Sequence, residues 1–198
     1  MSSNSDPRPA PRARCAACAL PSRACVCALV ARVSNRVDVL VLQHPDEASE
    51  AKGSARLLAL GLARCRVVVG EVFEPAALAP LLVTGSALLY PDVTAAPVAA
   101  VEGAAVTQLV VLDATWRKSL RMLHGNPLLQ ELPRWALRSP PAGRYAPLRR
   151  ARRTDQLSTL EATCAALADI EGDAVRYATL LEAFDGFVAD RLARAHRP

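Results

Sequence analysis

Short apolar runs rich in branched residues alternate with helix-like segments along this chain, and that alternation constrains the fold more than any other feature. The runs that we expect to form strands span residues 36–43, 65–73, 86–91, 108–115 and 134–139. Most are nearly continuous in apolar residues, so both faces of each strand are expected to be buried. The sequence therefore predicts an α/β fold with a mostly parallel sheet that is flanked by helices.

Helices are expected between these strands, and two of them close the chain. The expected helical ranges are residues 47–63, 74–82 (a short helix or turn), 116–123, 158–170 and 173–195. Glycine and proline in "HGNP" end the third of these helices at Gly125 and Pro127.

Four of the six cysteines lie close together before the first expected strand, in the pattern C-x₂-C-x₆-C-x-C. They are Cys15, Cys18, Cys25 and Cys27. Two close pairs can place four thiolates around one tetrahedral zinc ion, and such a complete set of ligands makes the zinc structural. Unliganded thiols are the alternative. Cys65 and Cys164 lie in apolar patterns and are expected in the core.

The N-terminal residues 1–14 are rich in proline, serine and arginine, and they are expected to form a disordered basic tail. A zinc-binding segment is expected over residues 15–35 and a single α/β domain over residues 36–198. No signal-peptide segment is visible, and no apolar run approaches the ~20 residues that span a bilayer. We therefore expect a cytoplasmic protein, where clustered cysteines favour metal or redox chemistry over disulfides.

The positive charge is concentrated before the last two helices. The net charge is +5, and residues 132–154 contain seven arginines and no acidic residue. Residues 155–198 contain eight acidic residues and four arginines. The basic stretch is either a solvated arginine-rich face or a patch that binds phosphate groups, and composition alone favours neither.

Polar residues follow two of the expected strands. In "LDATW" (Leu112–Trp116), Asp113 can act as a general base or a hydrogen-bond acceptor, because ligands collect at the carboxyl ends of parallel strands. The alternative is that Asp113 or Thr115 caps the following helix. In "QHP", His44 can touch a ligand or RNA, or serve as a structural hydrogen-bonding residue.

The stretch "STLEA" carries a capping box, in which Ser158 precedes Glu161 by three residues. A helix N-terminus also offers free N–H groups to an anionic ligand, so capping and binding can coexist. The sequence has no G-x-G-x-x-G and no G-x-x-x-x-G-K-[ST], which leaves an ordinary Rossmann nucleotide site and a P-loop unsupported.

Taken together, these stretches resemble the DTW-domain family, the tRNA-uridine aminocarboxypropyltransferases. The stretches that match, in family order, are "CAACALPSRACVC", "VLQHPDEASEAKGSARLL", "LLYP", "LDATWRKSLRML" and "LSTLEATCAAL". The D-x-T-W motif is intact as Asp113, Thr115 and Trp116, while Ser54 stands where threonine is expected.

The resemblance implies an enzyme that uses S-adenosylmethionine as co-substrate. It would transfer the 3-amino-3-carboxypropyl group to N3 of a tRNA uridine, at position 47 of the variable loop, and release methylthioadenosine. A SPOUT-like fold with a C-terminal trefoil knot is also implied, and residues 36–198 become the catalytic domain. tRNA is the expected partner, with no membrane and no evident obligate protein partner.

The resemblance and the chemistry together suggest a role for each group of residues. The candidate catalytic residues are Asp113, Thr115 and Trp116, with Asp113 as the base for the N3 proton and Trp116 stacking on the base or the adenosine. The residues expected to bind the cofactor are Leu89, Tyr90, Pro91, Leu112, Asp113, Ser139, Pro140, Tyr145, Ser158, Thr159 and Glu161. The residues expected to bind RNA are His44, Arg117, Arg149, Arg150, Arg152 and Arg153.

Two other functions remain open from the sequence. A SPOUT-like RNA methyltransferase would use the same cofactor but release S-adenosylhomocysteine. A non-catalytic zinc-bearing RNA-binding module would need only the cysteine cluster and the basic stretch, and it would leave D-x-T-W and STLEA unexplained beyond capping.

Overall fold

The computed structural model describes residues 13–50, 53–91, 105–137, 141, 143 and 157–195. Its parallel strands form one five-stranded sheet in the order β2-β1-β4-β3-β5. The strands are β1 (Asp38–Gln43), β2 (Cys65–Val69), β3 (Ser86–Leu89), β4 (Gln108–Asp113) and β5 (Arg134–Trp135). Each expected strand is present, so the predicted α/β fold with a parallel sheet is confirmed.

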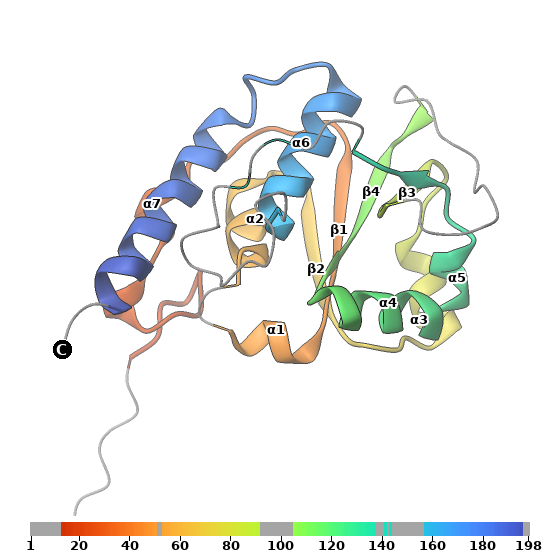
Figure 1. Ribbon diagram of the computed structural model, residues 1–198, viewed down its shortest axis with the longest axis horizontal. Coiled ribbons are helices and arrows are strands. Elements are labelled where there is room, and N and C mark those ends of the chain that lie inside the picture. Colours follow the sequence, from red (N-terminus) through yellow and green to blue (C-terminus); the bar gives the residue numbers. More distant parts are fainter. Residues whose placement is uncertain are drawn as a thin grey trace, which may run out of the picture.

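Helices cover both faces of the sheet, as Figure 1 shows. The helices on one face are α2 (Ala55–Gly61), α6 (Thr159–Glu171) and α7 (Ala178–Ala195). The helices on the other face are α3 (Pro75–Leu78), α4 (Trp116–Gly125) and α5 (Pro127–Gln130). A short helix, α1 (Pro45–Ser49), follows the carboxyl end of β1. Because both faces are covered, the central strand β4 is buried along its whole length.

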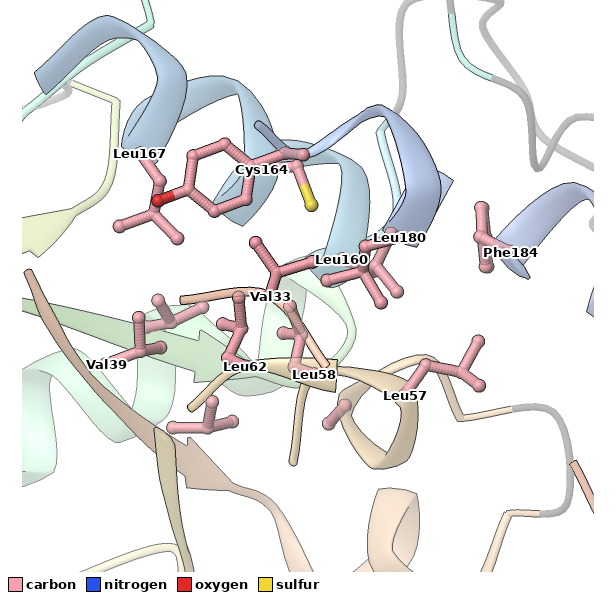
Figure 2. Close-up of a cluster of buried hydrophobic side chains, with 14 of the residues drawn as sticks. Val33, Val39, Leu57, Leu58, Leu62, Leu160, Cys164, Leu167, Leu180 and Phe184 are labelled. Atoms are coloured by element: carbon pink, nitrogen blue, oxygen red, sulfur yellow. The ribbon is translucent and has the colours of Figure 1, made fainter. Parts of the chain in front are cut away.

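The larger of the two cores lies between the sheet and the layer of α2, α6 and α7. Figure 2 shows Leu160 and Leu167 of α6 above Leu58 and Leu62, which lie in and directly after α2. Cys164 is buried in this core, and Cys65 packs against it, as the sequence predicted for both. This packing sets the position of α6, and with it the position of the first residues of that helix.

The cysteine segment packs onto the same core rather than standing apart from it. Its short 3₁₀ helices are η1 (Ser22–Ala24) and η2 (Cys27–Leu29), and η2 contacts α7. Cys18, Leu20 and Val26 are buried in the core that α6 and α7 line. Residues 1–12 of the expected basic tail lie outside the described residues, and Arg14 pairs with Pro21 in an isolated bridge.

The helix expected over residues 47–63 is in fact two helices, so this prediction was wrong. His44 caps α1 and Pro45 is its first residue, while the backbone at Glu50 is already extended, with ψ at 121°. Ser54 then stands before α2. Proline favours the first position of a helix, so it starts α1 close to the strand, and the chain turns before α2 begins.

The helix expected from residue 173 begins only at Ala178. The side chain of Asp173 accepts hydrogen bonds from the backbone N–H and Nε of Arg176, which holds residues 173–176 in a turn. Gly172, with φ at 65°, ends α6 in the left-handed conformation that glycine adopts without strain. These two features reverse the chain so that α7 can return along the core.

Glu171 joins the end of α6 to the start of β1. One oxygen of its carboxylate accepts from the backbone N–H groups of Arg36 and Val37 at 2.7 and 3.0 Å, and the other accepts from Arg176 at 2.9 Å. Its side chain is 1% exposed. We expect Glu171→Ala to lower the free energy of unfolding by about 3–5 kcal/mol, because it leaves the buried N–H of Val37 and the partly buried donors of Arg36 and Arg176 without an acceptor.

Urea unfolding measures this loss. The matched control is Glu182→Ala on the exposed face of α7, which should change stability by less than about 0.5 kcal/mol. Equal stabilities of the two variants would show that Glu171 does not tie α6 to the sheet.

Candidate functional site

A cavity of about 600 Å³ lies where β3, β4 and β5 end and α6 begins. Of the residues that the sequence assigned to the site, those that line it are Leu89, Tyr90, Pro91, Leu112, Thr115, Trp116, Ser158 and Thr159. Two motifs that are more than 40 residues apart in the sequence, D-x-T-W and S-T-x-E, therefore meet at one cavity.

Trp116 forms an aromatic platform at the cavity together with Tyr90. The two rings stack with centroids 5.3 Å apart and an angle of 13° between their planes. Tyr90 is buried, and its hydroxyl lies 3.2 Å from that of Ser119. Burial raises the pKa of Tyr90, so the hydroxyl stays protonated. Trp116, by contrast, is 55% exposed and can offer its ring to a flat ligand.

Asp113 is not among the residues that line the cavity, although it belongs to the same motif as Trp116. It is 6% exposed. One carboxylate oxygen accepts from Gln43 Nε2 at 2.8 Å, and the other accepts from Thr159 Oγ1 at 2.6 Å. Thr115 stands at the N-cap position of α4, but its side chain makes no capping hydrogen bond. The Asp113 carboxylate therefore joins β1, β4 and α6, and neither Asp113 nor Thr115 caps α4 through its side chain.

The capping box at the start of α6 is complete. Ser158 Oγ accepts from the backbone N–H of Glu161 at 3.2 Å, and Glu161 Oε2 accepts from the backbone N–H of Ser158 at 2.8 Å. Ser158 lines the cavity, whereas Glu161 is buried and does not. The box orders the first turn of α6 beside the cavity, which is the capping function that the sequence predicted.

His44 and Arg117 lie outside the cavity lining. His44 is 5% exposed; its Nδ1 accepts from the backbone N–H of Asp46, and its Nε2 lies 3.4 Å from Glu71. This geometry agrees with the structural alternative for His44, and its contact with RNA stays a prediction. Arg117 is exposed on α4. Beside it, Lys118 lowers the pKa of Asp46 through an ion pair of 2.8 Å.

Part of the expected site falls outside the described residues. These residues are Ser139, Pro140, Tyr145, Arg149, Arg150, Arg152 and Arg153. Their assignments to cofactor and RNA binding stay predictions.

Sequence reasoning missed Trp135 and Leu137, which line the cavity in and after β5. Trp135 Nε1 is buried and has no hydrogen-bond partner among the residues that the structure describes. A buried donor of this kind normally has a partner, so its position in the cavity wall is consistent with a ligand that accepts from it. The sequence did contain a signal for Trp135, because an aromatic residue at the carboxyl end of a parallel strand lies where ligands collect.

The four N-terminal cysteines are gathered in the structure, with their sulfur atoms all within 4.8 Å of one another. Sγ of Cys15 lies 3.7 Å from that of Cys27, and Sγ of Cys18 lies 3.8 Å from that of Cys25. Four sulfurs at about 2.3 Å from a tetrahedral zinc ion lie about 3.8 Å apart, so the residues fit this metal.

The backbone N–H groups of Cys18 and Ala17 lower the pKa of Cys15 to about 6. These hydrogen bonds favour the thiolate form of Cys15, which is the form that binds a metal ion. The cluster can hold a metal ion such as zinc.

Among the described residues, no helix has both the length and the hydrophobicity that crossing a membrane requires. Comparisons with curated proteins and with solved structures gave no match. The model of the DTW domain matches residues 12–192, which include the cysteine cluster, the sheet and both motifs at the cavity. The chain belongs to the DTW-domain family.

Proposed function

We propose that this chain transfers the 3-amino-3-carboxypropyl group of S-adenosylmethionine to N3 of a tRNA uridine and releases methylthioadenosine. The observation that carries the proposal is the single cavity at which D-x-T-W and S-T-x-E meet. Membership of the DTW-domain family supports an RNA-modifying transferase. The variable-loop uridine at position 47, the cytoplasmic location and the SPOUT-like trefoil knot belong to the same proposal.

The cavity suits S-adenosylmethionine in size and in chemistry. Small-molecule sites have volumes of about 300–1,000 Å³ and combine apolar walls with a few polar groups. Here the apolar wall comes from Leu89, Leu112 and Leu137, and the hydroxyl groups from Thr115 and Thr159. Trp135 Nε1 has no partner within the described part of the chain, so it can donate to a nitrogen or oxygen of the adenosine.

The transfer needs little covalent chemistry from the protein. The lone pair of uridine N3 attacks the methylene carbon next to sulfur, the N3–C bond forms, and the C–S bond breaks. The bonding electrons stay on sulfur, which becomes the neutral thioether of methylthioadenosine, and the N3 proton leaves to a base. The sulfonium is already an activated leaving group, so the site must supply placement: the methylene carbon and not the methyl group has to lie in line with N3.

In this proposal the zinc is structural. Cys15, Cys18, Cys25 and Cys27 would fill all four of its coordination positions, which leaves none for a substrate. Its role would be to order the N-terminal segment against the core.

tRNA binding is assigned to the arginine-rich stretch and to Arg117. We expect replacement of Arg149, Arg150, Arg152 and Arg153 by Gln to weaken tRNA binding and to leave the affinity for S-adenosylmethionine nearly intact. The slope of log affinity against log salt should fall by about 0.7–0.9 for each phosphate group that the variant no longer neutralises. The salt dependence of tRNA binding, measured by fluorescence anisotropy, checks this expectation.

The matched control is Arg64→Gln. Arg64 pairs with Asp38 at 2.6 Å, at the edge of the sheet where the strands begin and away from the cavity. Its replacement should leave the slope unchanged. An unchanged slope in the fourfold variant, or an equal loss of tRNA and cofactor binding, would show that the arginine-rich stretch is misassigned.

Two measurements separate the proposal from its alternatives. Isothermal titration with S-adenosylmethionine distinguishes an enzyme from a non-catalytic RNA-binding module, which should not bind it. Chromatography of the reaction products distinguishes the transferases, because aminocarboxypropyl transfer leaves methylthioadenosine and methyl transfer leaves S-adenosylhomocysteine. Release of S-adenosylhomocysteine alone would replace the proposal with a methyltransferase.

A further inference from the structure

Gln43, Asp113 and Thr159 form a continuous chain of hydrogen bonds across three elements. Gln43 and Asp113 are paired residues at the ends of β1 and β4, and their backbones lie in direct register. The bond from Gln43 Nε2 to Asp113 is 2.8 Å long, and the bond from Thr159 Oγ1 to Asp113 is 2.6 Å long. Each oxygen of the Asp113 carboxylate therefore already accepts from a neutral donor.

The alternation of side chains in β4 explains why α6 meets Asp113. Leu109 and Val111 point into the core beneath α6, and Asp113 is the next residue on that face. At this point the core ends and α6 begins with Thr159. The Thr159–Asp113 bond lies beside the cavity, because Thr159 lines it.

This arrangement suits a group that holds a wall in place better than a group that accepts a proton from a substrate. A general base must come within hydrogen-bond reach of the proton that it takes. The Asp113 carboxylate is buried and is not part of the cavity lining, and each of its oxygens already accepts a hydrogen bond, at 2.8 Å from Gln43 and at 2.6 Å from Thr159.

We propose that Asp113 and Gln43 are positioning residues, which fix Thr159 and the first turn of α6 in the wall of the cofactor cavity. The inference rests on the proposed function, because it concerns the cavity assigned to S-adenosylmethionine. The Thr159 hydroxyl donates its hydrogen bond to Asp113, so it can only accept a hydrogen bond from a ligand. The N3 proton of uridine then leaves to solvent and not to Asp113.

The first test is Asp113→Asn in single-turnover transfer to saturating tRNA, across a series of pH values. An asparagine oxygen still accepts from Thr159, and its amide can donate to a flipped Gln43. We expect the rate to fall by less than about tenfold, with a pH profile parallel to that of the wild type. A fall of about 10²–10⁴-fold that alkali partly restores would identify Asp113 as the base and overturn the inference.

The second test uses the affinity for S-adenosylmethionine, measured by isothermal titration. Thr159→Ser keeps the hydroxyl and Thr159→Val removes it at almost the same volume. We expect the valine variant to bind about tenfold more weakly than the wild type and Gln43→Met to bind severalfold more weakly, while the serine variant should keep most of the affinity that the valine variant loses. Equal affinities of the valine and serine variants would contradict the inference.

A double-mutant cycle separates positioning from direct contact. If Asp113 acts through Thr159, Asp113→Ala combined with Thr159→Val should weaken binding no more than the worse single variant. Additive losses would show that the two residues act independently and overturn the inference. If Asp113→Ala does not fold, the variants Asp113→Asn, Thr159→Ser and Thr159→Val still test the inference.

Failure of the proposed function has a different signature. A wild type that binds S-adenosylmethionine but modifies no tRNA would contradict the proposed reaction, and the affinity cycle would still test the positioning residues. If the wild type binds no S-adenosylmethionine, the proposed function is wrong. The proposal that these residues position the wall of a cofactor cavity is then wrong as well.

Discussion

Removal of metal from the N-terminal cysteine cluster is expected to unfold residues 13–33. The regular structure of this segment is limited to two short 3₁₀ helices and isolated bridges, so something else must hold its buried residues Cys18, Leu20 and Val26 in the core. Structural zinc contributes about 10–16 kcal/mol of apparent binding free energy in isolated zinc fingers. The loss should therefore be the largest single effect on the stability of the chain.

Elemental analysis of protein purified without chelator should find one zinc per chain. Cys18→Ser, or prolonged treatment with a chelator, should remove the metal and open the segment to limited proteolysis. The matched control is Cys65→Ala, because Cys65 is not one of the four clustered cysteines and burial raises the pKa of its thiol to about 12. Its replacement should leave the zinc content unchanged. Metal-free protein with unchanged folding and four freely alkylated thiols would contradict this account.

Trp116→Ala is expected to reduce transfer to tRNA by about 10–100-fold at subsaturating RNA. Stacking of a base on an aromatic side chain contributes about 1–3 kcal/mol, and 1.4 kcal/mol corresponds to a tenfold change. The ring is 55% exposed and lies on Tyr90 at the cavity, where an unstacked uridine can meet it. The loss should appear in kcat/KM for tRNA, and Trp116→Phe should restore part of it.

The affinity for S-adenosylmethionine decides what Trp116 stacks on. We expect Trp116→Ala to change this affinity by less than about threefold, because the ring is expected to serve the uridine. A parallel loss of cofactor binding would place Trp116 on the adenosine instead. Val175→Ala is the control for removal of an exposed apolar side chain, since Val175 is 81% exposed, and it should change neither quantity.

The sheet could be predicted from the sequence because its strands carry their own signal. β4 and β1 are short, nearly continuous apolar runs, and buried parallel strands have that composition. The order of the strands had no such signal, because it depends on which helices pack on which face. The helix expected over residues 47–63 failed for a local reason: Pro45 and His44 start a separate helix, and the chain is already extended at Glu50.

The candidate site could be predicted wherever one motif lies at the end of a strand. Thr115 and Trp116 were found in this way, Ser158 was found from the capping box at the start of a helix, and all three line the cavity. Trp135 was missed because β5 was considered for its loop and not for its own side chains. The partners of Asp113 could not be predicted at all, because Gln43 and Thr159 come from segments 70 and 46 residues away in the sequence.

The most direct test of the central claim is to identify the nucleoside that the protein makes. Purified protein is incubated with S-adenosylmethionine and unmodified tRNA, the RNA is digested to nucleosides and to oligonucleotides, and both are examined by mass spectrometry. The account predicts a uridine that is heavier by one aminocarboxypropyl group, in a variable-loop fragment, in amounts equal to the methylthioadenosine released. A methylated nucleoside, or tRNA that stays unmodified while the protein binds S-adenosylmethionine, would contradict it.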